Sequence, residues 1–450
     1  MRERMLLGFY GDDFTGSTDA MEVLARSGYK TILFLEAPDD AVIVDKFSGY
    51  NCVGIAGVSR ALPTNQLEDE LETVFRTLFS YKPMFIHYKV CSTFDSSPQV
   101  GSIGKVPEIA RKHMSNQRTI PMLVASPALK RYTVFGHHFA SVAGKVYRLD
   151  RHPVMSKHPV TPMDESDLRI HLAKQADCVT ELLHVIDLDA GYESVRKTYN
   201  EKLEAHPDVI LMDCLTEMHI EEIGRLLWEE AHLQDDPLFI IGSSGVENAL
   251  TNGWDRFGSK RDKGEAVFQS PGEADALLVV SGSCSPVTNQ QVDHVLQAGY
   301  HGIHLQVHEM VQAEDEELLD EIVKEACTCL QNGKSVVIYT ARGPEDPSIA
   351  EVRQSGLGAG ESLGRLLGRI TKKIVRSSGI RRVCVAGGDT SGFATRELGV
   401  YALEVLYPSA PGAPLCICHS DELEMNGLQL ALKGGQLGQI DYFEKVRKGV

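Results

Sequence analysis

The chain has 450 residues, and its shares of 43% hydrophobic and 24% charged residues are ordinary for a globular protein. Single hydrophobic cores stop growing at roughly 250 to 300 residues, so we expect two domains. The formal net charge of −17 argues against nucleic acid and anionic membranes as partners, because both are normally bound by a basic face.

No apolar run approaches the length of a membrane span, and the first residues lead straight into a strand-like segment, so we expect a cytoplasmic protein. The ten cysteines are scattered and several lie in apolar runs, which suits a reducing compartment. Cys327 with Cys329, and Cys416 with Cys418, have C-x-C spacing instead of the C-x2-C spacing of a zinc site. No metal-ligating residues are therefore predicted.

The first part of the chain alternates between strand-like and helical patterns. Residues 5–11 form a predicted buried strand, residues 19–26 a helix and residues 30–36 a second strand. Further strands are predicted at 52–58, 84–90, 122–128, 208–214 and 238–244, with helices such as 66–79 and 219–232 between them. This alternation predicts a mainly parallel sheet with helices on both faces.

A charged segment with Gly and Pro, residues 255–273, shows neither the helical nor the strand period of hydrophobic residues and is the predicted linker. A second series of strands follows at 277–285, 301–307, 335–341, 381–392 and 416–421, separated by helices at 289–299, 317–331 and 361–378. We therefore predict an α/β fold with two α/β domains, residues 1–260 and 274–450. Each has a mainly parallel sheet, and a ligand cleft lies between them.

Two turns of the second domain join a strand to a helix and are rich in small residues. Their candidate phosphate-binding residues are Ser283, Ser285, Gly387, Gly388, Asp389 and Thr390. Backbone N–H groups at such turns can approach a phosphate, and the helix N-terminus adds partial positive charge. Ordinary turns and helix caps use the same residue types, so both interpretations stay open.

A third glycine cluster, residues 430–438, contains Lys433 and Gly435. A lysine beside glycines can pair with phosphate charge, or it can be a solvated surface residue. These turns match neither the P-loop pattern nor the G-x-G-x-x-G dinucleotide fingerprint, which disfavours a Walker-type NTPase and a Rossmann dehydrogenase.

Candidate substrate residues follow strands in the first domain. Asp12 and Asp13 precede a helix, where they can cap its N-terminus, bind polyol hydroxyls, hold magnesium or accept a proton. A second strand end supplies donors and acceptors for a small polar ligand: Lys89, Ser92, Thr93 and Asp95. His158 and Thr161 lie in a proline-rich loop, residues 151–168, that alone looks like a linker.

Together these segments resemble the four-carbon acid sugar kinase family over nearly the whole chain. The shared motifs keep the same order and spacing: GDDFTGSTDAMEVLARSG, STFDSSP, GSIG, HPVTPMDESDL, SGSCSPVTNQQV, AGGDTSGFATRELGV and LALKGGQLGQIDYF. The resemblance implies ATP- and magnesium-dependent phosphorylation of threonate, erythronate, 3-oxo-tetronate or a related acid in carbohydrate-acid catabolism.

The resemblance also assigns the site residues to the two domains. It implies an N-terminal domain that holds the acid through Asp12, Asp13, Thr15, Lys89, Ser92 and Thr93. We add Asp95, His158 and Thr161 as candidate substrate-binding residues. The resemblance implies a C-terminal domain that holds ATP through Ser283, Ser285, Gly387, Gly388, Asp389, Thr390 and Gly435. Asp12 or Asp13 is the expected base that deprotonates the acceptor hydroxyl.

One departure from the family pattern bears on the substrate. Usual members have K-x-D-S-T-L-R-G where this chain has KVCSTFDSSP, so Cys91 replaces an Asp and Asp95 replaces an Arg. An Arg there can pair with a substrate carboxylate, whereas an Asp repels it and instead accepts a hydrogen bond from a substrate hydroxyl. A branched or oxo-acid such as 3-oxo-isoapionate therefore fits as well as threonate or erythronate.

Two other functions are left open. One is a nucleotide-regulated sugar-acid sensor, and the other, less favoured, is a sugar-acid dehydrogenase. The expected ligands are a small sugar acid and ATP, and the sequence leaves a homo-oligomer open.

Overall fold

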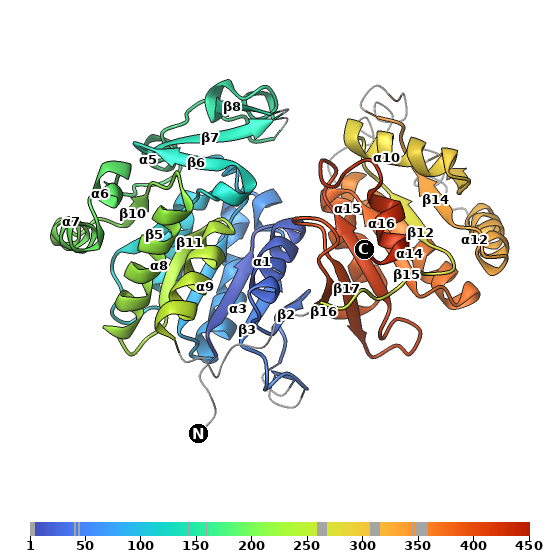
Figure 1. Ribbon diagram of the computed structural model, residues 1–450, viewed down its shortest axis with the longest axis horizontal. Coiled ribbons are helices and arrows are strands. Elements are labelled where there is room, and N and C mark those ends of the chain that lie inside the picture. The colour runs from blue at the N-terminus through green and yellow to red at the C-terminus, as the bar shows by residue number, and fades with distance from the viewer. Residues whose placement is uncertain are drawn as a thin grey trace. The chain divides into compact units, whose positions relative to one another are not determined.

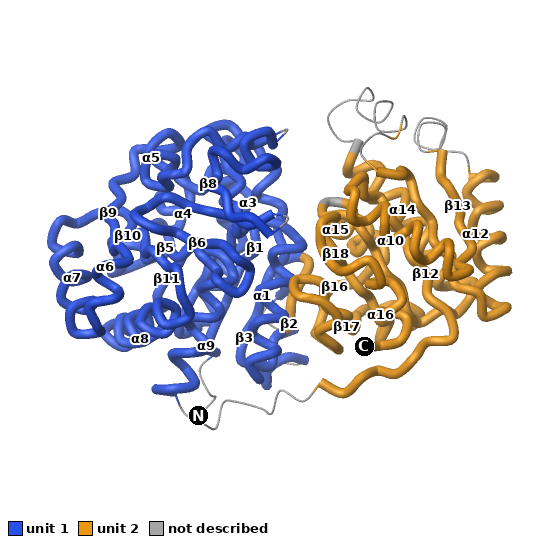
Figure 2. The backbone as a smooth tube through the Cα atoms, turned by 45° about the horizontal axis from the view of Figure 1, so that its top comes forward, with its two compact units in different colours: residues 1–31, 36–266 blue, residues 32–35, 267–450 orange. Residues whose placement is uncertain are grey.

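The computed structural model describes residues 5–39, 42–43, 46–142, 144–158, 160–258, 268–306, 316–343, 346 and 359–450. It divides into two compact units, residues 1–31 with 36–266 and residues 32–35 with 267–450 (Figure 2). Both units combine helices with a mainly parallel sheet, which confirms the predicted α/β class.

The first unit is built on a parallel sheet with the strand order β3-β1-β4-β11-β5-β10-β9. Its strands are β1 (Leu7–Gly11), β3 (Cys52–Ala56), β4 (Phe85–Lys89), β5 (Ile120–Leu123), β9 (Thr180–Leu183), β10 (Val209–Met212) and β11 (Leu238–Gly242). All but β9 are fully buried, which explains their continuous apolar sequences.

Helices cover both faces of this sheet (Figure 1). They are α1 (Phe14–Arg26), α3 (Leu67–Ser80), α4 (Val106–Arg111), α5 (Leu168–Ala173), α6 (Val185–Asp189), α7 (Tyr192–Glu204), α8 (Glu217–His232) and α9 (Gly245–Phe257). The predicted helices 66–79 and 219–232 correspond to α3 and α8.

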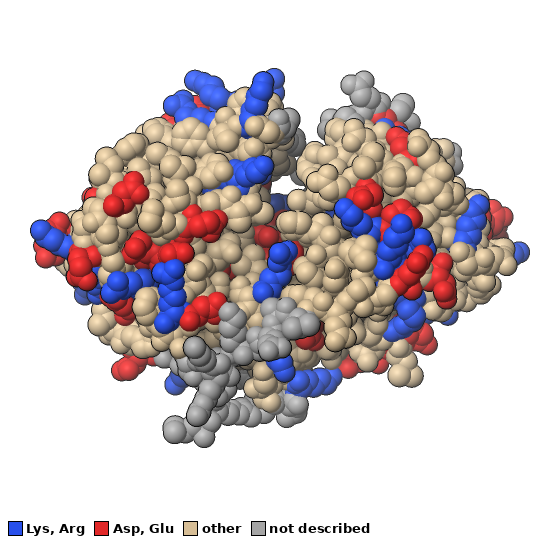
Figure 3. All heavy atoms as spheres, viewed as in Figure 1, with Lys and Arg blue, Asp and Glu red and all other residues tan. Residues whose placement is uncertain are grey.

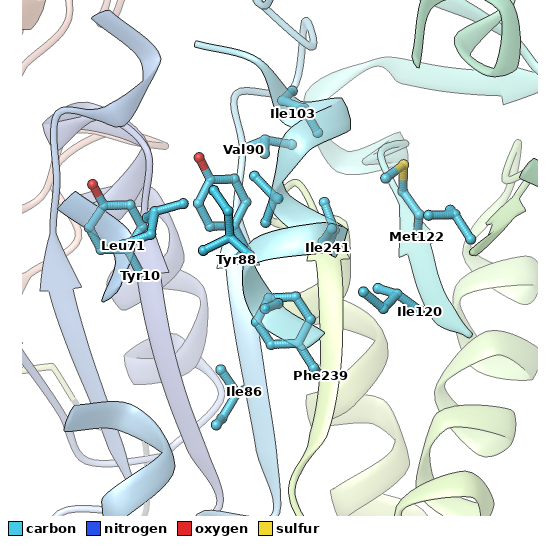
Figure 4. Close-up of a cluster of buried hydrophobic side chains, with 14 of the residues drawn as sticks. Tyr10, Leu71, Ile86, Tyr88, Val90, Ile103, Ile120, Met122, Phe239 and Ile241 are labelled. Atoms are coloured by element: carbon cyan, nitrogen blue, oxygen red, sulfur yellow. The ribbon is translucent and has the colours of Figure 1, made fainter. Parts of the chain in front are cut away.

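One hydrophobic cluster fixes α3, α4 and α5 on a single face of the sheet (Figure 4). It takes alternate residues of each strand, such as Ile86 with Tyr88 and Phe239 with Ile241, because successive side chains point to opposite faces. The ring of Phe239 lies 5.4 Å from that of Phe75 and 6.3 Å from that of Phe79, measured between centroids. The cluster thus ties the middle of the sheet to α3.

A small antiparallel sheet in the first unit was not predicted. It consists of β6 (Arg131–Val134), β7 (His137–Val142) and β8 (Lys145–Arg148). The buried carboxylate of Asp213 accepts hydrogen bonds from the backbone N–H groups of Phe135 and Gly136 in its first turn, at 2.5 and 2.9 Å. A residue at the end of β10 therefore holds this sheet in place.

The second unit has the strand order β13-β14-β12-β15-β18-β17-β16-β2, parallel from β13 to β18 and antiparallel beyond. Its strands are β2 (Thr31–Phe34), β12 (Leu278–Ser281), β13 (His301–His304), β14 (Val336–Tyr339), β15 (Arg382–Ala386), β16 (Val400–Tyr407), β17 (Leu415–Ser420) and β18 (Gln429–Lys433). Its helices are α10 (Pro286–Gln297), α12 (Glu316–Gln331), α14 (Ala359–Ser378), α15 (Gly388–Glu397) and α16 (Tyr442–Lys448).

Residues Ile32–Leu35 come from the N-terminal part of the chain but belong to the second unit. Strand β2 pairs with β16 in antiparallel register, and the N–H of Leu35 donates to the carbonyl of Tyr401 at 3.0 Å. The sequence predicted this strand correctly but placed it in the first domain. It forms an edge of the second unit instead.

Charges on the face shown in Figure 3 are mixed, with acidic and basic side chains interspersed. The net charge of −17 is therefore not gathered in one patch on that face. Among the described helices, none is both long and apolar enough to cross a membrane.

The contacts of Phe239 make it a test of the first unit's core. We expect Phe239→Ala to lower the free energy of unfolding by about 3 to 5 kcal/mol, because it removes a buried ring and leaves a cavity. Leu233→Ala should change it by less than about 1 kcal/mol, because Leu233 is 71% exposed.

Both tryptophans, Trp228 and Trp254, lie in the first unit, so urea unfolding followed by tryptophan fluorescence reports that unit alone. Equal unfolding free energies for the two variants would contradict the described packing.

Candidate active site

Three neighbouring strands of the first unit end at the same edge of its sheet. In β1, Gly11 is in register with Ala56 of β3 and with Lys89 of β4, so the residues after these strands come together. The N–H of Asp12 donates to the carbonyl of Lys89 at 2.9 Å, and the N–H of Arg60 donates to the carbonyl of Asp12 at 3.0 Å. These bonds join the ends of all three strands.

Asp12 is buried with an unpaired oxygen. Its side chain is only 1% exposed, and Oδ1 has no hydrogen-bond partner among the described residues. Burial, together with the nearby carboxylate of Asp13, raises the pKa of Asp12 to about 8, although Arg60 and Lys89 oppose the shift. Asp12 can therefore exchange a proton near neutral pH.

Asp13 is engaged by its neighbours. It is the N-cap of α1, where its Oδ1 accepts from the N–H of Gly16 at 3.0 Å. Its Oδ2 forms an ion pair with Arg60 at 2.9 Å. The capping role considered for the two aspartates is thus confirmed for Asp13, while Asp12 lies outside the cap.

Lys89 is a buried cation held against the start of α1. A Cβ at Gly16 would lie 2.9 Å from its Nζ, so glycine is what allows the lysine to approach. A positive charge at a helix N-terminus is unfavourable by itself. Burial alone would lower the pKa of Lys89, but the carboxylates of Asp19 and Asp13 raise it, so the lysine stays charged.

The loop after β4 has a strained backbone. Phe94 is fully buried and has a φ of +57°, a conformation that bulky residues rarely adopt. Its ring belongs to the main hydrophobic cluster, and its N–H donates to the carbonyl of Cys91 at 2.9 Å. Packing of this ring therefore fixes the turn that carries Ser92 and Thr93.

Two buried histidines anchor the same loop. His138 of β7 donates through Nε2 to the carbonyl of Ser92 and accepts through Nδ1 from the Thr133 hydroxyl, both at 2.9 Å. His171 of α5 lies 3.0 Å from the hydroxyl of Ser96. Burial lowers the pKa of each histidine to about 4, so both are neutral supports at physiological pH.

Asp95 lies in this loop and points away from bulk solvent. It is 8% exposed, and its Oδ1 has no hydrogen-bond partner in the described part of the chain. Its charge acts on Asp12, whose pKa it helps to raise, and burial with Asp95 raises the pKa of Cys91 to about 12. Asp12, Asp13, Lys89 and Asp95 thus form one electrostatic cluster.

The remaining predicted substrate residues differ in how they relate to this cluster. Thr15 is half-buried in the first turn of α1, and the Thr93 hydroxyl lies 3.2 Å from the sulfur of Cys91. His158 and Thr161 bond to each other, with Nδ1 accepting from the Thr161 hydroxyl at 2.9 Å. His158 and Thr161 are therefore tied to each other by this bond.

In the second unit, the ends of β12, β15 and β18 bring three glycine turns together. The N–H of Gly282 donates to the carbonyl of Ala386 at 3.0 Å, and that of Gly387 to the carbonyl of Lys433 at 2.9 Å. A Cβ at Gly282 would lie 2.6 Å from the hydroxyl of Thr390, and one at Gly435 2.7 Å from that of Ser283. Only glycine permits this close approach.

The first residues of the adjoining helices lie at these turns. Ser285 is the N-cap of α10 and accepts from the N–H of Val287 at 3.2 Å. Gly387 precedes α15 with a φ of +136°, and the helix starts at Gly388 without a side-chain cap. Capping is thus confirmed for Ser285 and wrong for Thr390, which lies buried inside α15. The side chain of Asp389 is outside the description.

Lys433 is fully buried beneath the turns, so the alternative of a solvated surface lysine was wrong. Its Nζ donates to the Thr288 hydroxyl at 2.8 Å and to the carbonyl of Gly435 at 3.4 Å. Thr288 in turn donates to the same carbonyl at 2.8 Å. Burial lowers the pKa of Lys433 to about 8.

Sequence reasoning missed Arg60 and Arg131. Arg60 lies two residues after the predicted strand 52–58, so its place at a strand end was a signal for it in the sequence. Arg131 starts β6 of the unpredicted sheet, and the sequence carried no comparable signal for it. Arg60 pairs with Asp13, and the charge of Asp95 acts on Arg131, so the cluster contains cations beyond the predicted Lys89.

Two family models match the chain. One, described as a sugar-binding N-terminal domain, covers residues 7–250. The other, described as a nucleotide-binding C-terminal domain, covers residues 278–443.

Relatives match over nearly the full length. A 3-oxo-isoapionate kinase from Paraburkholderia graminis is 40% identical over 99% of this chain and 94% of its own. A 3-oxo-tetronate kinase from Pseudomonas fluorescens is 31% identical over 98% of this chain and 96% of its own. The corresponding enzyme from Pectobacterium atrosepticum is 27% identical over 98% of both chains.

Two solved structures have the same fold. A Salmonella typhimurium LT2 protein matches with a TM-score of 0.78 at 23% identity over 99% of both chains. A Haemophilus influenzae protein matches with a TM-score of 0.72 at 23% identity, over 98% of this chain and 99% of its own. Since both family models and the full-length relatives agree with the motifs, this chain belongs to the four-carbon acid sugar kinase family.

Proposed function

We propose that this chain is an ATP-dependent kinase that phosphorylates a hydroxyl of a small branched or oxo sugar acid. Residues 1–260 bind the acid, and residues 274–450 bind the nucleotide. The observation that carries the proposal is the buried, unpaired Asp12 carboxylate beside Lys89 and Arg60. The 40% identity to a 3-oxo-isoapionate kinase supports the branched oxo-acid as substrate class.

Asp12 is the proposed base. Efficient general bases have a pKa near the operating pH, and that of Asp12 is about 8. Asp13 is less suited, because the cap of α1 and the ion pair with Arg60 occupy its two oxygens. Asp12 accepts the proton of the acceptor hydroxyl as that oxygen attacks the γ-phosphorus in line.

The three glycine turns are the proposed phosphate site. Backbone N–H groups at the start of α15, which has no side-chain cap, suit phosphate oxygens, because a helix N-terminus carries partial positive charge. Ser283 and Ser285 can add their hydroxyl groups from the neighbouring turn. Lys433 adds a positively charged side chain beneath these turns. Thr390 and Gly435 set the spacing between them, as their crowded approach to Gly282 and Ser283 indicates.

Magnesium is expected to arrive with the nucleotide. The described residues contain no group of three or more His, Cys, Asp or Glu side chains placed to hold a metal ion. Magnesium sites in kinases ordinarily use one or two carboxylates together with phosphate oxygens and water, so this donor set fits. When bound, the ion would neutralise charge on the phosphates.

The kinase is favoured over the other two functions. The relatives named above are kinases, and a nucleotide-regulated sensor would not need a buried base beside its ligand. The chain also lacks the G-x-G-x-x-G turn that would support a dehydrogenase.

The function is tested by incubating the purified full-length chain with ATP and magnesium and with 3-oxo-isoapionate, 3-oxo-tetronate, threonate or erythronate. ADP is measured, and the product is identified by mass spectrometry. We expect ADP release to depend on the acid, and to be faster with the oxo-acids than with threonate or erythronate. Tight ATP binding without ADP release from any acid would favour the sensor.

Asp12→Asn should lower kcat by on the order of 10² to 10⁴, because an amide cannot accept the proton. In the unchanged protein, kcat/KM should rise with pH and level off above about pH 8, where Asp12 is ionised. Steady-state kinetics from pH 6 to about 9 measures both effects.

The same variant should be more stable than the unchanged protein at pH 8. The folded state keeps the Asp12 proton up to about pH 8, whereas the unfolded state loses it near its ordinary value of 3.8, so stability falls between these pH values. The Asp12→Asn variant has no carboxyl group to ionise at this position, so it does not lose this stability. Asp13→Asn serves as the matched control: its amide oxygen can still cap α1, but the variant loses the ion pair with Arg60 and should therefore be less stable than the unchanged protein. Wild-type turnover in Asp12→Asn would remove Asp12 as the base.

Lys433 should take up protons when ATP binds, because nearby phosphate raises its pKa from about 8. At pH 8 we expect uptake of up to about half a proton per nucleotide. Calorimetry in two buffers with different ionisation enthalpies measures this number. Lys433→Met should lose the uptake and bind ATP more weakly.

Lys445→Met is the control, because Lys445 forms only an exposed ion pair with Asp441 in α16. Proton uptake that survives in Lys433→Met would show that this lysine does not sense the phosphates.

A further inference from the structure

A sugar acid carries a carboxylate, yet the cations predicted or found beside Asp12 are already engaged. Arg60 pairs with Asp13 at 2.9 Å. Lys89 donates to the carbonyl of Val90 at 3.0 Å and is balanced by Asp13 and Asp19. Because Asp95 stands where the family pattern has arginine, the carboxylate of the ligand requires another cationic partner.

Arg131, the first residue of β6, has the free edge that a carboxylate needs. Its Nη1 donates to the carbonyls of Leu129, Lys130 and Ser141 at 3.1, 3.3 and 3.2 Å, which fixes the guanidinium. Its Nε is buried without a hydrogen-bond partner, and within the described chain it forms no ion pair. The remaining Nε and Nη2 edge is the one that binds carboxylates in a bidentate manner.

The small sheet ties Arg131 to the loop that carries Asp95, because β6 pairs with β7 and His138 of β7 bonds to the carbonyl of Ser92. Burial lowers the pKa of Arg131, and the negative charge of Asp95 partly offsets this effect. A guanidinium buried without a counter-ion is unfavourable, so an anionic ligand would stabilise it. The nearby His138 and His152 cannot take this role, because burial lowers the pKa of both.

Three buried polar atoms of this cluster have no partner: Nε of Arg131, Oδ1 of Asp12 and Oδ1 of Asp95. One donor with two acceptors complements one carboxylate and two hydroxyls, which is the chemistry of a hydroxy acid. We propose that Arg131 binds the carboxylate of the sugar acid, while Asp95 accepts a hydrogen bond from a hydroxyl that is not phosphorylated. This assignment deepens the proposed function and rests on it.

The competing view is that Arg131 only ties the small sheet together through its three carbonyl contacts. That view predicts the same loss for charged and neutral ligands, whereas carboxylate binding affects the charged ligand alone. The test therefore compares the acid that the wild-type protein phosphorylates best, among 3-oxo-isoapionate, threonate and erythronate, with the primary amide of that acid.

Arg131→Met should lower kcat/KM for the acid by on the order of 10- to 100-fold, mainly through KM, and leave that for the amide within about threefold. The kcat/KM of Arg131→Lys for the acid should lie between those of the wild-type protein and Arg131→Met, because an ammonium keeps the charge but not the bidentate geometry. Asp95→Asn should weaken acid and amide alike. Arg148→Met is the matched control, since Arg148 of β8 pairs with Asp150 at the surface and should leave both values unchanged.

Equal losses for acid and amide in Arg131→Met would overturn the proposal and leave the structural role. Should that variant fail to fold, as judged by tryptophan fluorescence, the acid-to-amide ratio of Arg131→Lys decides in the same way. A wild-type protein that phosphorylates none of the acids would instead refute the proposed function itself, and the assignment of Arg131 with it.

Discussion

Parallel pairing of β1 with β3 and β4 is the constraint on which the site depends. Because the carboxyl ends of parallel strands meet at one edge, Asp12, Arg60 and the loop after Lys89 come together without any contact between their side chains being required. The same rule acts in the second unit, where β12, β15 and β18 deliver three turns to one place. The candidate site residues of each unit therefore lie at the edge where its parallel strands end.

That concentration has an energetic cost that the surrounding fold must offset. The cluster holds carboxylates at Asp12, Asp13 and Asp95, whose mutual repulsion inside the protein opposes folding. Buried cations balance part of it, and the packed ring of Phe94 holds its loop in a strained backbone conformation. Function and stability therefore make opposite demands on this edge of the sheet.

The elements that the sequence predicted well are those whose pattern is local. Apolar runs identified β1, β4 and β11, and the acidic and hydroxyl residues after β1 and β4 gave most of the candidate substrate residues. Strands β6 to β8 were missed because few of their residues are buried, so they lack the continuous apolar runs of the parallel strands, and Arg131 was missed with them. The burial of Lys433 was left open because it depends on packing against Thr288, 145 residues earlier, which no local pattern encodes.

Strand β2 has a consequence for how the chain matures. Its residues leave the ribosome early, yet their partner β16 is made only near the end of synthesis. The first unit can fold before β2 has its partner strand. The second unit cannot complete its sheet from residues 267–450 alone. A fragment with only those residues would present the edge of β16 unpaired, which invites association with other chains. The second unit therefore completes its sheet only with a segment from the N-terminal part of the chain.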